Sequence, residues 1–321
     1  MLDQDDVGHR VVVRHFVQIS PAGRPIYTDL LGDLIVADGE QLVVRTSDGT
    51  EHAVPTRDVV AGKRIPARRP SHAEITHLER VADEAWPAPV HERLGDWMLR
   101  AADGFTDRAN SALPLGEPDC PLPEAIAAVA AWYRARGLPP RITSPLPLRR
   151  EVDRALADLG WLARTPVLVQ TADLAAMLAG PLDTTGVRLH RQPSAGFRAL
   201  AAGRKGPLPA AADHVLTAVA QVRFAEAYAL AEAPDQVAGI ARGALVGDGR
   251  WLHLGLVDVA TAQRRHGLAT RLSQALAAWA AELGATRAVL QVEEDNTAAI
   301  ALYARLGFTT HHRYVTRVAP A

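Results

Sequence analysis

The chain has 321 residues, of which 48% are hydrophobic, and its 35 basic and 36 acidic residues give a formal net charge of -1. A chain of this length predicts two or three domains of about 100 to 200 residues each, and its near-neutral charge disfavours nucleic acid or an acidic membrane as a partner. The single cysteine excludes an internal disulfide, and the acidic N-terminus and the lack of an apolar run of about 18 residues lead us to expect a cytoplasmic protein.

Residues 1–66 predict a small all-β barrel. Short apolar runs, such as Val11–Val13 and Leu42–Arg45, are separated by turn residues, as at Pro21–Gly23 and Asp48–Gly49. The pattern resembles an SH3-like barrel. Because the segment holds more acidic than basic residues, it suits nucleic acid poorly. We interpret it as a docking or folding module with no ligand, and a protein partner bound through the barrel is the alternative. The basic, proline-bearing stretch Lys63–Pro70 then predicts a solvated linker.

Residues 71–180 contain an internal repeat of the later sequence. Trp132 precedes Trp279 by 147 residues, and the same offset superposes Gly137 on Gly284 and Gly160 on Gly307. Three coincident points argue for two similar halves in tandem. In the first half we expect strands at Trp97–Arg100 and Arg108–Leu115.

The second half, residues 185–321, predicts a helix around Ala210–Ala220 and then three strands. The strands are expected at Val222–Ala231, Gln236–Val246 and Trp251–Val259, joined by turns at Ala233–Asp235 and Gly247–Gly249. This arrangement is an antiparallel meander whose last strand leads directly into a glycine-centred turn.

That turn is the most informative motif of the chain. The segment Val257–Thr270 joins an apolar strand to a helix, and Arg264, Gly267 and Ala269 fit the pattern R/Q-x-x-G-x-G/A. Small residues let the main chain approach an anion, while the first amides of the helix have no partner within it. The motif therefore predicts a phosphate-binding turn.

A second motif follows after one more helix and the β-rich run Ala288–Val292. Asn296 starts a short helix as its capping residue, Tyr303 lies within it, and Gly307–Phe308 ends it. Both motifs, in this order and with these elements between them, resemble the GNAT (GCN5-related) N-acetyltransferases, and one group of actinobacterial GNAT proteins carries an SH3-like module ahead of two GNAT-like halves.

The resemblance implies an α/β fold, of the α+β GNAT type with a mixed sheet flanked by helices, and an acyltransferase that uses acetyl-CoA as its acetyl donor. The main chain at Val257 and Val259 would bind the pantetheine arm and the acetyl carbonyl. The expected coenzyme-binding residues are Val257, Val259, Arg264, Arg265, His266, Gly267, Leu268, Ala269, Thr270, Asn296 and Tyr303.

The first half has lost these residues. The offset places Glu117, Cys120 and Leu122 where the second half has Arg264, Gly267 and Ala269, and it replaces Asn296 and Tyr303 by Arg149 and Leu156. An acidic residue repels a pyrophosphate, and a side chain obstructs the approach that glycine allows. We expect a degenerate half that acts as a structural partner; a former site recruited for another ligand is the alternative.

Two residues are candidates for the chemistry. The resemblance places Tyr303 near the coenzyme sulfur as the acid, and a phenol with a reference pKa of about 10 is protonated at neutral pH. Some GNAT enzymes have a glutamate six residues before the position of Val259, where this chain has His253. An imidazole suits proton removal near neutral pH, but Glu226, Asp258 and Glu293 remain rival bases.

The leading hypothesis is a transferase that moves an acetyl group from acetyl-CoA to an amine of a small molecule or protein. The alternative is a non-catalytic regulatory protein that senses acetyl-CoA. Because His311–His312 lacks further ligands at metal-binding spacing, no metal is expected. The sequence does not indicate the acceptor or the oligomeric state.

Overall fold

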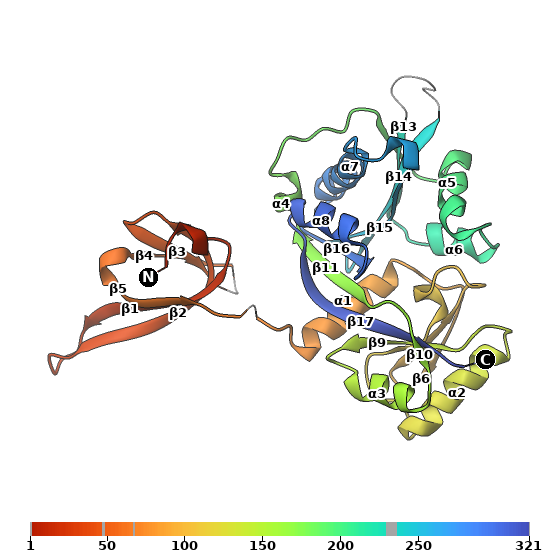
Figure 1. Cartoon of the computed structure of the whole chain (residues 1–321), viewed down its shortest axis with the longest axis horizontal. Coiled ribbons are helices and arrows are strands. Elements are labelled where there is room, and N and C mark those ends of the chain that lie inside the picture. The colour runs from red at the N-terminus through yellow and green to blue at the C-terminus, as the bar shows by residue number, and fades with distance from the viewer. Residues whose placement is uncertain (1, 47–48, 67, 229–235, 321) are drawn as a thin grey trace. The chain divides into compact units, whose positions relative to one another are not determined.

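A computed structural model describes residues 2–46, 49–66, 68–228 and 236–320. The chain divides into two compact units, Met1–Arg69 and Pro70–Ala321 (Figure 1). None of the helices in the described ranges is long and apolar enough to cross a membrane.

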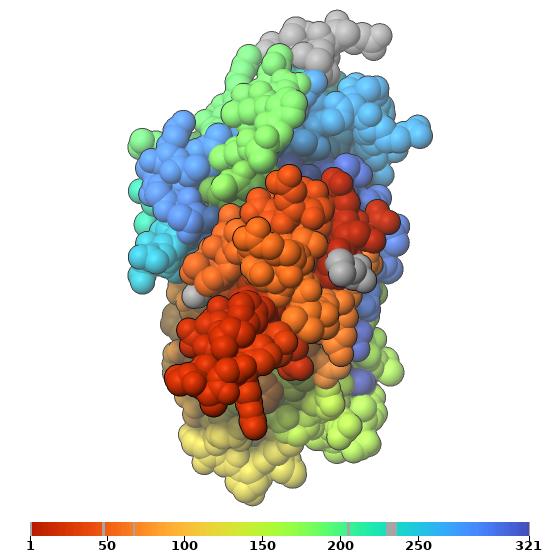
Figure 2. All heavy atoms as spheres, turned by 90° about the vertical axis from the view of Figure 1, so that its left-hand side faces the viewer, coloured from red at the N-terminus to blue at the C-terminus, as the bar shows by residue number. Residues whose placement is uncertain are grey.

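The first unit is an all-β barrel with the strand order β4-β3-β2-β1-β5. Its elements are η1 (Gln4–Asp6), β1 (Arg10–Ile19), β2 (Pro25–Ala37), β3 (Gln41–Arg45), β4 (Glu51–Pro55), η2 (Thr56–Asp58) and β5 (Val59–Arg64). Alternate residues of the strands, among them Val11, Val13 and Val44, form its core. The β1–β2 hairpin keeps Ile19 and Tyr27 exposed; the barrel is coloured red to orange in Figure 2. The predicted turn at Asp48–Gly49 lies partly outside the described residues.

The second unit contains both halves of the repeat. The first half comprises α1 (His72–Glu84), β6 (Val90–Leu94), β7 (Trp97–Ala101), η3 (Arg108–Asn110), β8 (Leu113–Pro114), α2 (Leu122–Arg134), β9 (Arg141–Leu146), α3 (Arg150–Asp158), β10 (Leu162–Ala163), β11 (Val167–Asp173) and α4 (Leu174–Leu178). The second half comprises β12 (Val187–His190), α5 (Ala195–Lys205), α6 (Ala211–Thr217), β13 (Val222–Tyr228), β14 (Val237–Val246), β15 (Trp251–Val259), η4 (Thr261–Gln263), α7 (Leu268–Glu282), β16 (Arg287–Glu293), α8 (Thr297–Arg305) and β17 (Thr309–Val318).

The structure confirms the repeat. Shifted by the distance between Trp132 and Trp279, α3 coincides with α8, β9 lies within the range of β16, and α2 lies within that of α7. Helices α2 and α7 are each followed by a glycine with positive φ, Gly137 (66°) and Gly284 (90°). Glycine adopts this left-handed conformation without the strain of a Cβ atom, so it ends both helices.

The two halves exchange strands at their junction. The large sheet has the order β10-β17-β11-β16-β15-β14-β13-β12, with β9 paired to β17. Strand β11, from the first half, thus lies between β16 and β17 of the second half. Strand β17 also pairs with β9 of the first half (Figure 1). Residues 70–321 therefore form one structural unit in which neither half completes its sheet alone.

One element differs from the sequence predictions, and another can be compared only in part. Arg108–Leu115 was expected as a strand, but it forms the 3-10 helix η3 and the two-residue strand β8. The cause is Asn110. Its side chain accepts hydrogen bonds from the amides of Ala102 and Gly104, which keeps this part of the chain in a closed loop and out of an extended strand. Strand β13 ends at Tyr228; the remainder of that predicted strand and the turn Ala233–Asp235 lie outside the described residues.

Candidate active site

The site begins where two parallel strands diverge. Strands β15 and β16 pair from Trp251 to Leu254 only. Beyond that point the register of β15 with β14 shifts, and Leu256 adopts a positive φ of 51°. A cavity of about 280 Å³ opens there. Gly255 is needed at the bend, because a Cβ atom would stand 2.6 Å from the Trp86 ring.

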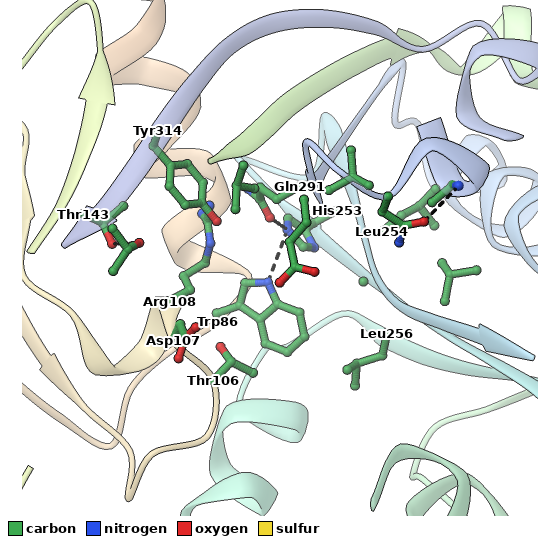
Figure 3. Close-up of a pocket in the computed structure, with 18 of the residues that line it drawn as sticks. Trp86, Thr106, Asp107, Arg108, Thr143, His253, Leu254, Leu256, Gln291 and Tyr314 are labelled. Atoms are coloured by element: carbon green, nitrogen blue, oxygen red, sulfur yellow. Dashed lines mark hydrogen bonds between the residues drawn. The ribbon is translucent and has the colours of Figure 1, made fainter. Parts of the chain in front are cut away.

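The walls of the cavity come from both halves. Asn296, Ala299 and Tyr303 line the end beside the divergent part of β15. Thr106, Asp107 and Arg108 of the first half, with Tyr314 of β17, line the other, and Trp86 lies between the two ends beside His253 (Figure 3). The predicted residues Val257, Asn296, Tyr303 and His253 thus meet in one cavity, as do Asp258 and Glu293, whereas Glu226 does not line it.

The predicted phosphate turn leads into α7 at the end of β15. Arg265 and Gly267 have positive φ of 66° and 77°, and the first helical bond runs from the Arg271 amide to the Gly267 carbonyl. The amides of Leu268, Ala269 and Thr270 precede that bond, and the first turn of α7 contains no acidic residue. Arg264, Arg265, His266 and Gly267 are exposed. The arrangement suits an anion, because unpaired amides and the positive end of the helix dipole point the same way.

The turn is fastened to the strand before it. Arg264 Nε donates to the Val259 carbonyl (3.1 Å), and the Val259 amide donates to Asp258 Oδ1 (2.9 Å). A ligand that used the Val259 main chain would have to displace these side chains. Val257 lines the cavity directly, so it is better placed of the two to bind a ligand through its main chain.

Helix α8 presents its predicted residues to the cavity. Asn296 caps the helix by accepting from the Ala299 amide (3.2 Å). Tyr303 is 8% exposed and packs edge-on against Phe308 with 5.7 Å between ring centroids. Gly307, with a φ of 85°, ends the helix, which turns the chain so that Phe308 meets Tyr303.

His253 lies buried in the wall of the cavity. Its Nε2 accepts from the Trp86 indole (3.3 Å) and, with the Gln291 amide oriented to donate, from Gln291 (2.8 Å). Burial lowers the pKa of His253 to about 3. A neutral imidazole whose lone pair is already engaged is poorly suited to remove a proton, so the geometry argues against His253 as the base and favours a packing role.

A charged cluster at the first-half end was not predicted. Arg108 has an 8% exposed side chain, stands 3.9 Å from Glu79 and lies 5.1 Å from the centre of the Tyr314 ring. Its Nη1 and Nη2 donate to the Gln291 oxygen (3.0 and 3.1 Å). Burial alone would lower the pKa of Arg108, but Tyr314 and Glu79 outweigh it and raise the value. No spacing rule identifies this arginine, because it reaches the cavity from the other half of the repeat.

The equivalent place in the first half is a small pocket whose lining suits a pyrophosphate poorly. Glu117 and Arg149, at the positions of Arg264 and Asn296, form an ion pair of 2.8 Å. Pro121 and Pro123, at the N-terminus of α2, stand where α7 has Leu268 and Thr270, so α2 lacks two of the three amide donors that α7 has. Leu156, at the position of Tyr303, is a core residue. Among the described residues, no three His, Cys, Asp or Glu side chains are grouped to hold a metal.

The fold and the divergent strands define the class of protein as a GNAT N-acetyltransferase. The chain belongs to the family of the probable histone acetyltransferase Rv0428c: residues 72–317 match its C-terminal part and residues 5–63 its N-terminal Sm-like domain. The Mycobacterium tuberculosis protein of that name is 31% identical over 322 residues, which cover 97% of this chain and 95% of that one. An uncharacterized N-acetyltransferase of Bacillus subtilis, YobR, is 27% identical over 255 residues, 76% of this chain and 99% of its own. A GCN5-related N-acetyltransferase from Kribbella flavida has the same fold, with a TM-score of 0.54 and 17% identity over 79% of this chain and 97% of its own.

Proposed function

We propose that the second half binds acetyl-CoA and transfers its acetyl group directly to a primary amine of a small molecule or protein, with both substrates bound at once. The observation that carries the proposal is the cavity between β15 and β16, where Val257, Asn296 and Tyr303 meet beside the exposed N-terminus of α7. Two substrates entering this opening from opposite faces of the sheet would meet in it, which supplies proximity and orientation.

In the proposed reaction the coenzyme pyrophosphate is held by the amides of Leu268, Ala269 and Thr270, assisted by the side chains of Arg264 and Arg265. The Val257 main chain aligns the thioester. The amine nitrogen attacks the thioester carbonyl, so that a C–N bond forms and the C–S bond breaks.

Two protons move in this step. The departing thiolate takes a proton from the Tyr303 hydroxyl, whose side chain faces the cavity. The amine releases its proton to water near Asp258 and Glu293, the two carboxylates that line the coenzyme end of the cavity. Glu226 is the remaining rival, but it accepts from the Tyr228 hydroxyl (2.8 Å) and does not line the cavity.

Initial rates test the proposal. Free coenzyme and acetylated amine are measured while acetyl-CoA and a responsive amine from a broad panel are varied. Direct transfer predicts intersecting double-reciprocal lines and one acetylated amine per coenzyme released. Parallel lines would indicate an acetyl-enzyme intermediate. A protein that binds acetyl-CoA but acetylates no amine would instead be a sensor of the coenzyme.

A further inference from the structure

The degenerate first half contributes to the cavity a loop that is held in place by hydrogen bonds to a buried side chain. Asn110, which is 2% exposed, closes the loop: its Oδ1 accepts from the amides of Ala102 (2.8 Å) and Gly104 (2.9 Å), and its Nδ2 donates to the Thr106 carbonyl (2.7 Å). Phe105 anchors the loop in the core shared with Trp86 and Tyr314. Thr106, Asp107 and Arg108 are thereby held on one side of the cavity (Figure 3).

Positive charge exceeds negative charge at this end. Arg141 and Arg164 share one carboxylate, Asp107, at 3.1 and 3.4 Å. Arg100 pairs with Asp83. Within the described ranges, the one carboxylate paired with Arg108 is that of Glu79, at 3.9 Å, which also binds His312 at 2.9 Å.

Arg242 adds a further positive charge behind the cavity wall. It is fully buried and lies 4.8 Å from the centre of the Trp86 ring, and its Nη1 and Nη2 have no partner in the described part of the chain. The buried guanidinium groups of Arg108 and Arg242 favour an anion nearby, because charges interact more strongly away from water.

The coenzyme end of the cavity has two carboxylates in its lining. Asp258, which stands 4.0 Å from Arg264, and Glu293 lie there beside Asn296 and Tyr303. The cavity therefore offers carboxylates where the amine must approach the thioester and guanidinium groups at its other end. Its volume of about 280 Å³ suits a small molecule.

We propose that the acceptor is a small primary amine that also carries a carboxylate, with Arg108 binding the carboxylate while the amine faces the coenzyme. A planar guanidinium binds a carboxylate through paired hydrogen bonds, which gives geometric selectivity as well as attraction. The proposal rests on the proposed acetyl transfer and adds to it the class of acceptor and the role of the first half as the acceptor-binding wall.

The test compares matched acceptors: ω-amino acids of three to six carbons, each with its own carboxamide, in which the amine is kept and the charge removed. We expect kcat/KM for the carboxylate to exceed that for the carboxamide by about tenfold or more, as one charge-assisted pair contributes. Arg108→Gln should bring this ratio close to one, and Arg108→Lys should leave an intermediate ratio. Arg136→Gln, an arginine that stacks on Trp132 away from the cavity, is the control and should keep the wild-type ratio.

Each outcome decides the proposal. Wild-type enzyme that prefers the carboxamides, unsubstituted alkylamines or a lysine-rich peptide would overturn it and leave acetyl transfer standing, even if the Arg108 variants failed to fold. If folded Arg108→Gln kept the wild-type ratio of carboxylate to carboxamide kcat/KM, Arg108 would not bind the carboxylate and the proposal would fail. A wild-type protein that binds acetyl-CoA and acetylates no amine would overturn the proposed function, and the acceptor class with it.

Discussion

At the scale of single residues, the coenzyme side of the site and its acceptor side differ in how far the sequence predicts them. Tyr303 and Asn296 belong to a motif with fixed spacing on one helix, so their positions in the cavity could be predicted. Arg108 and Trp86 come from the other half and have no local pattern. Their part in the site follows from how the halves pack, which spacing does not encode.

Tyr303→Phe separates chemistry from binding. The substitution keeps the ring that packs on Phe308 but removes the proton donor, so acetyl-CoA affinity should stay within a few fold while kcat falls by roughly 10²-fold to 10⁴-fold. The lower value is expected, because a thiolate is a fairly good leaving group. A wild-type kcat from neutral to alkaline pH would make Tyr303 a packing residue and water the proton donor.

His253 should make the protein less stable in acid. Its folded pKa of about 3 lies below the unfolded value of about 6.5, so the unfolded chain binds the proton first and stability falls as the pH drops below 6.5. Between pH 6.5 and pH 4 this contribution amounts to about 3 kcal/mol.

Denaturant unfolding of wild type and His253→Gln across that range measures the contribution. The variant should lose less stability toward pH 4, and the acidic limb of its kcat/KM profile should keep the wild-type midpoint. Parallel stability curves would contradict the depressed pKa, and loss of the acidic limb would make His253 the base after all.

At the scale of elements, glycines and caps made the helices predictable. Gly137, Gly160, Gly284 and Gly307, which mark the repeat in the sequence, all have positive φ and follow α2, α3, α7 and α8. The strand predicted at Arg108–Leu115 failed because apolar content alone did not reveal that the Asn110 side chain would hold a loop closed. Whether a side chain takes the place of main-chain hydrogen bonding depends on the tertiary structure, and the apolar pattern of the sequence does not show it.

A negative charge at Gly267 tests whether the N-terminus of α7 binds the coenzyme pyrophosphate. A Cβ atom there meets open space, but the φ of 77° strains most side chains. Asparagine tolerates this conformation better than most residues, so Gly267→Asn isolates the strain and Gly267→Asp adds the charge. Calorimetric titration should show acetyl-CoA binding abolished in the Asp variant and weakened much less in the Asn variant.

The first half provides the matched control. Cys120→Asp, at the position equivalent to Gly267, should leave acetyl-CoA affinity unaltered, because Glu117 already places a negative charge there and pairs with Arg149. A loss of affinity in Cys120→Asp would mean that the first half binds the coenzyme. Equal affinity in the wild type and in folded Gly267→Asp would mean that the turn does not hold the pyrophosphate.

At the scale of the whole molecule, the repeat could be predicted and the exchange of strands could not. Matching tryptophans and glycines identify equivalent helices within one chain, whereas the placement of β11 between β16 and β17 depends on which sheet edges meet. Sequence patterns mark a strand but not its neighbours.

This exchange predicts how the chain tolerates truncation. Residues 70–321 hold a complete set of strands and should unfold cooperatively with unchanged acetyl-CoA affinity. Residues 185–321 lack β11 and β9, which leaves β16 and β17 with unpaired edges, so this fragment should aggregate or stay unfolded. Circular dichroism with thermal melting measures whether each fragment is folded. A stable fragment of residues 185–321 that binds the coenzyme would contradict the dependence of the second half on the first.

The location of acetyl-CoA in a crystal structure of the complex tests the central claim most directly, namely that the second half alone holds the coenzyme. We predict one coenzyme per chain, with its pyrophosphate against the amides of Leu268, Ala269 and Thr270 and its thioester in the cavity beside Tyr303. A coenzyme bound instead at Glu117 and Arg149, or one whose thioester lies outside the cavity between β15 and β16, would contradict the account.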